Sequence, residues 1–347
     1  MHGILHRCCG LTKIAAMSHV KKKTRLTAGH PKSMVSTTQT GQTLDDLLVW
    51  LKNCGTKGLD NGGLEFRNCD EDDGCGLGGF AKKDYVVGDV IFAIPLVCLI
   101  SVTSAYDTAV TKLVRDAAIA FEDSSLVTSE LLIWLFMIEQ LWNPSSHYYP
   151  YLHSLDSQSP SPLSWPTDLQ SALVGTNIST METSLSSVKR HATFLDSVRQ
   201  WAILTKRPCT FMDADRFNIT SLIWARGHYL ARRYPARFSS SKNNEIGVLS
   251  REDQGDGREE GMMNLGALVP LLDILNHNPE QEWLTFQVVD EYLNVTCNYP
   301  IKAKSEIFSN YGSLSNEMLL FAYGFCLEGN SDDAITLQLM GSNQIAG

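Results

Sequence analysis

The spacing of apolar residues divides the chain into a helical middle and strand-like flanks. In residues 128–142, TSELLIWLFMIEQLW, apolar side chains recur at intervals of three and four, which is typical of a helix that packs on a core. Those positions are Leu131, Leu132, Leu135, Ile138, Leu141 and Trp142. Residues 44–51, 189–205 and 213–234 also have helical patterns, whereas residues 147–166, punctuated by Pro and Ser, predict a loop.

Strand patterns flank this helical region. The stretches GGLEFRN (62–68) and DVIFAIP (89–95) are rich in apolar, β-branched and aromatic residues. WLTFQVV (283–289) and YLNVTCN (292–298) alternate in hydrophobicity on either side of residues 290–291, which predicts a β-hairpin, although Asp-Glu is not a strong pair for a two-residue turn. The fold class predicted from these patterns is α+β, with a helical block between β-type flanks.

Two segments are too polar for the packed part of the fold. Residues 1–40 hold five Lys, two Arg and no acid, which fits a mitochondrial or plastid transit peptide, a disordered basic tail, or upstream sequence ahead of a later start at Met17 or Met34. These alternatives leave cytoplasm, nucleus, mitochondrion and plastid open. Residues 239–261 are charged and glycine-bearing, which predicts a disordered loop.

Composition and charge indicate which classes of binding partner are compatible with the chain. The 347 residues suffice for two domains or for one domain with a large insertion, and 44% are hydrophobic. No apolar run reaches the roughly 18 residues of a membrane span, so we expect a soluble protein without a membrane partner. Beyond residue 40 the chain has 22 basic against 38 acidic residues. This balance disfavours nucleic acid and favours a basic or lysine-bearing protein substrate.

The nine cysteines form no CxxC pair. This spacing argues against a structural zinc cluster and against a disulfide scaffold, so we expect no metal, and thiols in a reducing compartment. The stretch GCGLGG (74–79) matches GxGxxG, but no helix pattern follows to hold a dinucleotide. Its glycines permit a close approach of the backbone to a polar ligand, or simply a tight turn between strands.

Two further stretches concentrate polar chemistry in apolar surroundings. In LLDILNHNPE (271–280), an apolar run carries Asp273 and ends on Asn276 and His277. One His and one Asp are too few for a metal site, which leaves a ligand-binding tip or a capped element end with a satisfied histidine. In SNYGSLSNEMLLFAYGF (309–325), Tyr311 and Tyr323 each precede glycine. A sharp turn can present these phenols to a ligand, and the alternative is that they are core aromatics.

Together these stretches resemble the SET-domain protein methyltransferases of the Rubisco large-subunit methyltransferase type, in which a helical insertion splits the SET domain. The resemblance covers residues 62–339. It is carried, in the family's order, by DGCGLGGFAKKDYVVGDVIFAIP, IWARGHYLARRY, ALVPLLDILNHNPE and NYGSLSNEMLLFAYGF. It implies a SET-domain β-fold with a pseudoknot, in which the Asn-His segment is threaded against the Tyr-containing segment.

The resemblance also implies domain limits. Residues 41–102 would form the N-terminal helix and the first part of the SET domain, residues 103–222 the helical insertion, and residues 223–330 the second part. Residues 331–347 would begin a C-terminal substrate-binding domain that is cut short in this chain. Residues 1–40 remain a tail or transit peptide.

Site residues follow by position in the motifs. The resemblance implies that S-adenosylmethionine (SAM) is bound by Asp73, Gly74, Cys75, Arg232, Asn276, His277 and Phe325. The substrate side of the site would comprise Arg232, Asp273, Tyr311 and Tyr323. Tyr311 matches the catalytic tyrosine, and Tyr323 lines the lysine channel.

The implied activity is SAM-dependent protein-lysine N-methylation by in-line methyl transfer, performed by a monomer. Two alternatives stay open on the sequence. Relatives of the split-SET type modify an actin histidine through the same scaffold, and a catalytically silent SET module would bind protein partners without reaction.

Overall fold

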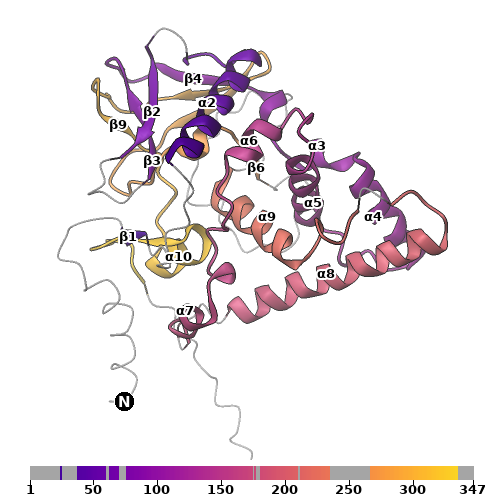
Figure 1. Cartoon of the computed structure of the whole chain (residues 1–347). Helices are drawn as coiled ribbons and strands as arrows, with labels where there is room; N and C mark the ends of the chain where they lie inside the picture. The colour runs from indigo at the N-terminus through magenta and orange to yellow at the C-terminus, as the bar shows by residue number, and fades with distance from the viewer. Residues whose placement is uncertain are drawn as a thin grey trace, which may run out of the picture.

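The computed structural model describes residues 24–25, 37–59, 62–69, 76–174, 176, 180–209, 212–234 and 266–334. The helices among them are α2 (Thr37–Asn53), α3 (Val102–Tyr106), α4 (Ala109–Ala120), α5 (Ser129–Leu141), α6 (Tyr149–Ser154), α7 (Thr167–Ser171), α8 (Thr180–Leu204), α9 (Ile219–Arg232) and α10 (Asn316–Tyr323), with 3-10 turns η2 (Leu96–Cys98), η3 (Pro162–Ser164) and η7 (Leu272–Ile274). The strands are β1 (Thr24–Arg25), β2 (Leu64–Asn68), β3 (Leu77–Ala81), β4 (Val90–Pro95), β5 (Arg233–Tyr234), β6 (Ala267–Leu268), β7 (Thr285–Val289), β8 (Tyr292–Thr296), β9 (Glu306–Ile307) and β10 (Phe325–Cys326). Figure 1 shows most strands gathered at one end of the molecule, with α4, α5, α8 and α9 at the other.

Antiparallel pairing builds the strand end. The strand orders of the two three-stranded sheets are β2-β3-β9 and β4-β8-β7, and β5-β6 and β1-β10 are short two-stranded pairs. The hairpin predicted for residues 283–298 is confirmed as β7 and β8. Its turn residues, Asp290 and Glu291, have φ angles of 49° and 65°. Both therefore adopt the positive φ of a primed turn without the glycine that normally favours it.

Helix α5 forms the centre of the helical end. Every residue from Leu131 to Ile138 is buried, so the helix is enclosed on all sides rather than on one face. The Thr128 hydroxyl caps its first turn by accepting from the Leu131 N–H at 3.1 Å. The expectation that Trp142 faces the core is wrong: the side chain lies beyond the end of the helix and is 53% exposed, with the Arg216 guanidinium 5.4 Å from its ring centroid.

Caps and strand pairing correct two predicted boundaries. Helix α9 begins at Ile219, because the Asn218 side chain accepts from the Ser221 N–H at 3.0 Å and starts the helix there. It ends at Arg232, because the next two residues pair with β6. The predicted helix 213–234 was therefore too long at both ends, whereas α8 and α2 begin earlier than predicted.

The glycine motif leads into a strand, β3, which the sequence analysis missed. No helix follows it, in agreement with the absence of a dinucleotide fingerprint. A Cβ at Gly78 would lie 3.1 Å from Asn276 Nδ2, and one at Gly79 would lie 2.6 Å from Leu275 Cδ2. The two glycines therefore allow β3 to approach the Asn-His segment closely.

The predicted domain limits stay predictions. Helices α3 to α8 follow β4 and precede β5, in the interval assigned to the insertion. The predicted loop 239–261 lies outside the described residues, as do most of residues 1–40 and residues 335–347. None of the helices described here combines the length and hydropathy needed to cross a membrane.

Candidate active site

A buried apolar anchor holds the Asn-His segment. Leu271, Leu272 and Leu275 are fully buried. Leu271 adopts a φ of 78° and a ψ of −47°, a rare γ-turn geometry that costs a non-glycine residue about 1–3 kcal/mol and persists only where packing imposes it. The anchor fixes the position of the polar end formed by Asn276 and His277.

A second stretch, residues 309–311, lies beside this polar end. The Ser309 N–H donates to the Asn276 carbonyl oxygen at 2.8 Å, and His277 and Ser309 form a parallel bridge. The Tyr311 N–H donates to His277 Nδ1 at 3.1 Å, across 34 positions of sequence. Because Nδ1 accepts, the neutral imidazole carries its proton on Nε2. Two distant segments are thus joined by backbone and side-chain hydrogen bonds.

Tyr311 is held by contacts on both its ring and its hydroxyl. The hydroxyl donates to the Leu275 carbonyl oxygen at 2.8 Å. The ring stacks on His277, with centroids 4.9 Å apart, and on Tyr323, at 4.8 Å. Burial raises the pKa of Tyr311, and the neighbouring Tyr323 raises it further. The phenol therefore stays protonated at neutral pH, and its lone pairs remain able to accept a hydrogen bond.

The end of α10 positions Tyr323 and adds a further aromatic ring, that of Phe325. Gly324 follows Tyr323 with a φ of 79°, and a Cβ there would lie 2.4 Å from the Pro160 carbonyl oxygen. Glycine is therefore required at this turn. The Phe325 ring centroid lies 6.2 Å from that of Tyr323 and 6.5 Å from that of His277. The turn thus places both aromatic residues around the same histidine–tyrosine stack.

A buried ion pair lies next to this aromatic cluster. Arg232 Nη1, at the end of α9, donates to the Asp273 carbonyl oxygen at 3.1 Å and to Asp273 Oδ2 at 3.3 Å. The Tyr151 hydroxyl, from α6, donates to the same Oδ2 at 2.8 Å. Burial raises the pKa of Asp273, and the Arg232 charge and the Tyr151 hydrogen bond partly offset this effect. Arg232 Nε and Asp273 Oδ1 are buried without a hydrogen-bond partner among the described residues.

The Asn276 side chain is engaged with the protein itself. Its Nδ2 donates to Glu306 Oε1 at 2.7 Å and to the Leu77 carbonyl oxygen at 3.2 Å. These contacts tie the Asn-His segment to β3 and β9. The side-chain amide therefore holds the segment in place. We expect Asn276 to contact a ligand through its backbone groups.

The structure brings together most of the residues that the resemblance assigned. Seven are described and lie in the ion pair, the aromatic cluster or the Asn-His segment beside them: Arg232, Asp273, Asn276, His277, Tyr311, Tyr323 and Phe325. The other three, Asp73, Gly74 and Cys75, lie outside the described residues. The individual roles of all ten stay predictions.

Sequence reasoning missed three supporting residues. Tyr151 lies in the stretch 147–166, which was predicted as a loop but contains α6 and η3. Glu306 is the first residue of β9, a two-residue strand that has no recognisable pattern. Tyr234 stands at the end of IWARGHYLARRY, and its hydroxyl donates to the Leu272 carbonyl oxygen at 3.2 Å. Of the three, only Tyr234 lay in a stretch that the sequence had singled out.

Sequence comparison shows which known proteins this chain is similar to. No protein-family model matches the chain. The N-lysine methyltransferase SETD6 of Rattus norvegicus is 25% identical over 280 residues, which cover 78% of this chain and 52% of that protein. The actin-histidine N-methyltransferase of Gallus gallus is 21% identical over 296 residues, covering 85% and 44%. The chain thus spans about half the length of these relatives.

Comparison with solved structures identifies the fold. The SET domain of LSMT bound to methyllysine and AdoHcy superimposes with a TM-score of 0.62 at 20% identity, covering 83% of this chain and 57% of that one. The chain therefore has the SET-domain fold of the Rubisco large-subunit methyltransferase type. The resemblance and the α+β fold class predicted from the sequence are confirmed.

Proposed function

We propose that this chain is a SAM-dependent protein N-methyltransferase that acts on lysine. The observation that carries the proposal is the junction of residues 309–311 with residues 275–277, made by three hydrogen bonds between these distant stretches. Names of similar proteins support it: one relative is an N-lysine methyltransferase, and one solved SET domain is bound to methyllysine and AdoHcy.

The described residues fit SAM as the methyl donor. SAM carries a carboxylate, an ammonium and an adenine ring. Arg232 Nε and Asp273 Oδ1 are a buried donor and a buried acceptor with no partner among the described residues, as expected of groups that a polar ligand satisfies. We assign Arg232 to the carboxylate, Phe325 to packing on the adenine, and the backbone of Asn276 and His277 to its polar edge. Asp73, Gly74 and Cys75 are proposed for the remaining contacts.

When bound, SAM supplies a methyl group made electrophilic by a positively charged sulfur. We assign Tyr311 to orienting the methyl group rather than to acting as an ionised base. Its hydroxyl proton is donated to the Leu275 carbonyl oxygen, and burial raises its pKa. Its oxygen and nearby backbone carbonyls can accept weak C–H···O contacts that hold a polarised methyl group in line. Burial around Tyr323 favours a neutral rather than a charged acceptor amine.

The substrate class follows from charge. Beyond residue 40 acidic residues outnumber basic ones, 38 against 22. Such a surface attracts a basic, lysine-bearing protein. Histidine as the acceptor is the second candidate, favoured by the actin-histidine N-methyltransferase that aligns with 85% of this chain.

Mass spectrometry with SAM carrying a deuterated methyl group tests the proposal and identifies the acceptor. The purified chain is incubated with labelled SAM and candidate basic proteins, and digested peptides are sequenced. We expect the label on a lysine Nζ, and about a hundredth of that labelling with the Tyr311→Phe variant at matched times. Label on a histidine would support the second candidate. SAM binding without transfer to any protein would instead indicate a catalytically silent module.

The dependence of kcat/KM on pH gives an independent prediction. A free lysine has a pKa of about 10.4, so its reactive neutral fraction, and with it kcat/KM, should rise about tenfold per pH unit between about pH 7 and 9. Because burial raises the pKa of Tyr311, ionisation of the phenol adds no second slope in that window. Tyr311→Phe should therefore lower the whole profile without changing its shape.

Two outcomes of that measurement would contradict the assignment. A profile that is flat above about pH 7.5 would indicate a histidine acceptor, whose free pKa is about 6.5. Loss of the rising limb in Tyr311→Phe alone would mean that the tyrosine acts as a base.

A further inference from the structure

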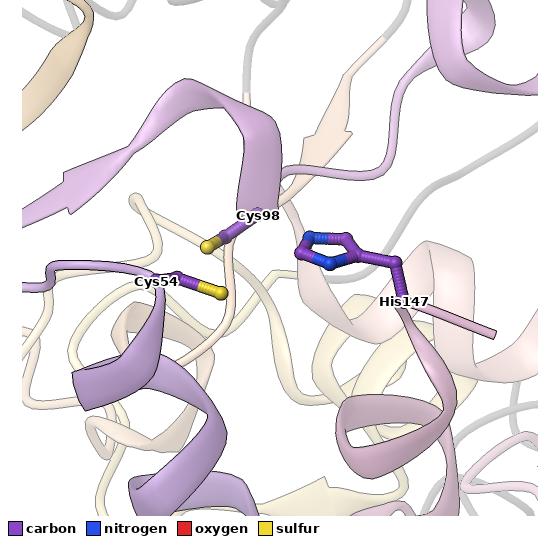
Figure 2. Close-up of side chains that lie close together, drawn as sticks. All are labelled: Cys54, Cys98 and His147. Carbon is purple, nitrogen blue, oxygen red and sulfur yellow. The ribbon is translucent and has the colours of Figure 1, made fainter. Parts of the chain in front are cut away.

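Two cysteines and a histidine converge in a part of the fold that the proposed activity does not use. Cys54 follows the last residue of α2, Cys98 ends η2, and His147 lies in the loop between α5 and α6. The two Sγ atoms and a ring nitrogen of His147 all lie within 4.8 Å of one another. Figure 2 shows the two cysteines and the histidine close together on three separate segments of the chain.

The surroundings restrict all three side chains. Cys98 is fully buried, Cys54 is half-buried and His147 is exposed. The imidazole packs edge-on against Trp50, with centroids 5.3 Å apart, and against Tyr148, at 4.9 Å. The Cys54 N–H donates to the Trp50 carbonyl oxygen at 2.9 Å, which fixes the backbone at the end of α2. Although exposed, the histidine is thus held close to the two thiols by aromatic contacts.

We propose that Cys54, Cys98 and His147 bind a zinc ion, with a solvent molecule as the fourth ligand on the exposed side of His147. Two thiolates and one imidazole are ligands that zinc prefers, and three protein ligands plus water are a known zinc arrangement. Zn–S distances of about 2.3 Å place tetrahedral sulfurs about 3.8 Å apart. A sulfur and an imidazole nitrogen at such an ion are about 3.5 Å apart, so the present separations need to contract by at most about 1.3 Å.

Binding has a defined proton balance and a structural consequence. Each thiol releases its proton to solvent as its sulfur coordinates the ion, and the imidazole binds in its neutral form. The ion would connect α2, the turn after β4 and the loop before α6. These segments come from the N-terminal helix, the strand end and the helical region, so zinc would stabilise their mutual position. The absence of a CxxC pair, which argued against a zinc cluster, does not exclude ligands that folding brings together.

Metal titration of the full chain tests this site. The protein is purified under reducing conditions, stripped with a chelator, and titrated with zinc in competition with a chromophoric chelator. We expect one zinc per chain, and an affinity lowered roughly tenfold or more by His147→Ala or Cys54→Ser. Cobalt(II) in place of zinc should give an intense sulfur-to-metal charge-transfer band. Zinc should also raise the Tm of the wild type but not that of His147→Ala.

Matched controls separate this site from the other thiols and histidines. His153→Ala removes an exposed histidine of α6, and Cys209→Ser removes a half-buried cysteine elsewhere; both should leave zinc affinity unchanged. His147→Ala changes an exposed side chain, and circular dichroism verifies its fold. The proposal is overturned if Cys54→Ser combined with His147→Ala still binds zinc as the wild type does, or if the cobalt complex lacks the sulfur band. It is also overturned if mass spectrometry finds a Cys54–Cys98 disulfide and the reduced protein takes up no zinc.

Discussion

Replacing Tyr311 with phenylalanine is expected to lower kcat about 100-fold, the size of loss that accompanies misplacement of reacting groups by about 1 Å. The dissociation constant of SAM should change little, because the hydroxyl binds the Leu275 carbonyl oxygen and the ring stacking on His277 and Tyr323 is retained. Single-turnover kinetics and a SAM titration measure the two quantities separately.

Tyr299→Phe is the matched control for this experiment. The Tyr299 hydroxyl also donates to a backbone carbonyl oxygen, that of Phe308, at 3.3 Å. Tyr299 has no ring contact with His277 or Tyr311 among those described. Its loss should leave kcat near that of the wild type. Similar losses of turnover and SAM affinity in Tyr311→Phe would show that the phenol serves binding rather than alignment.

Asp273→Ala should have the largest effect on folding. The Asp273 side chain is 1% exposed and pairs with the Arg232 guanidinium, whose side chain is 23% exposed. Removing one partner of a buried pair typically costs about 3–5 kcal/mol, because the other charge remains buried without compensation. Arg232 keeps its bond to the residue 273 carbonyl oxygen, so we expect a loss of about 3 kcal/mol in the free energy of unfolding.

Denaturant unfolding of Asp273→Ala and Asp84→Ala measures this effect against an exposed pair. Asp84 pairs with Lys302 at 2.9 Å, and the two side chains are 55% and 79% exposed. Water and salt screen such a pair, so its loss should leave the free energy of unfolding essentially unchanged. Equal effects of the two substitutions would mean that the Arg232–Asp273 pair contributes little.

The sequence predicted the elements whose periodicity is strong. The buried helix at residues 129–141 and the hairpin at residues 285–296 stand where the pattern of apolar residues placed them. The alternation determined the hairpin even though its turn residues, Asp290 and Glu291, are poor formers of a primed turn. Cross-strand burial therefore outweighed local turn preference.

Short elements, and elements of mixed composition, have no apolar periodicity from which they could be predicted. Strand β3 begins within the glycine motif, and its glycines gave no strand signal because they serve the close approach of Leu275 and Asn276. The Tyr151 hydrogen bond to Asp273 spans 122 positions of sequence, so no local pattern could indicate it. The convergence of Cys54, Cys98 and His147 was hidden for the same reason.

Isothermal titration calorimetry with SAM shows whether the Asn276–His277 segment, Tyr311 and Phe325 form one SAM pocket. We expect saturable heat corresponding to one site per chain, with binding weakened in Arg232→Ala. Absence of heat from a wild-type sample whose fold is verified by circular dichroism would contradict this expectation.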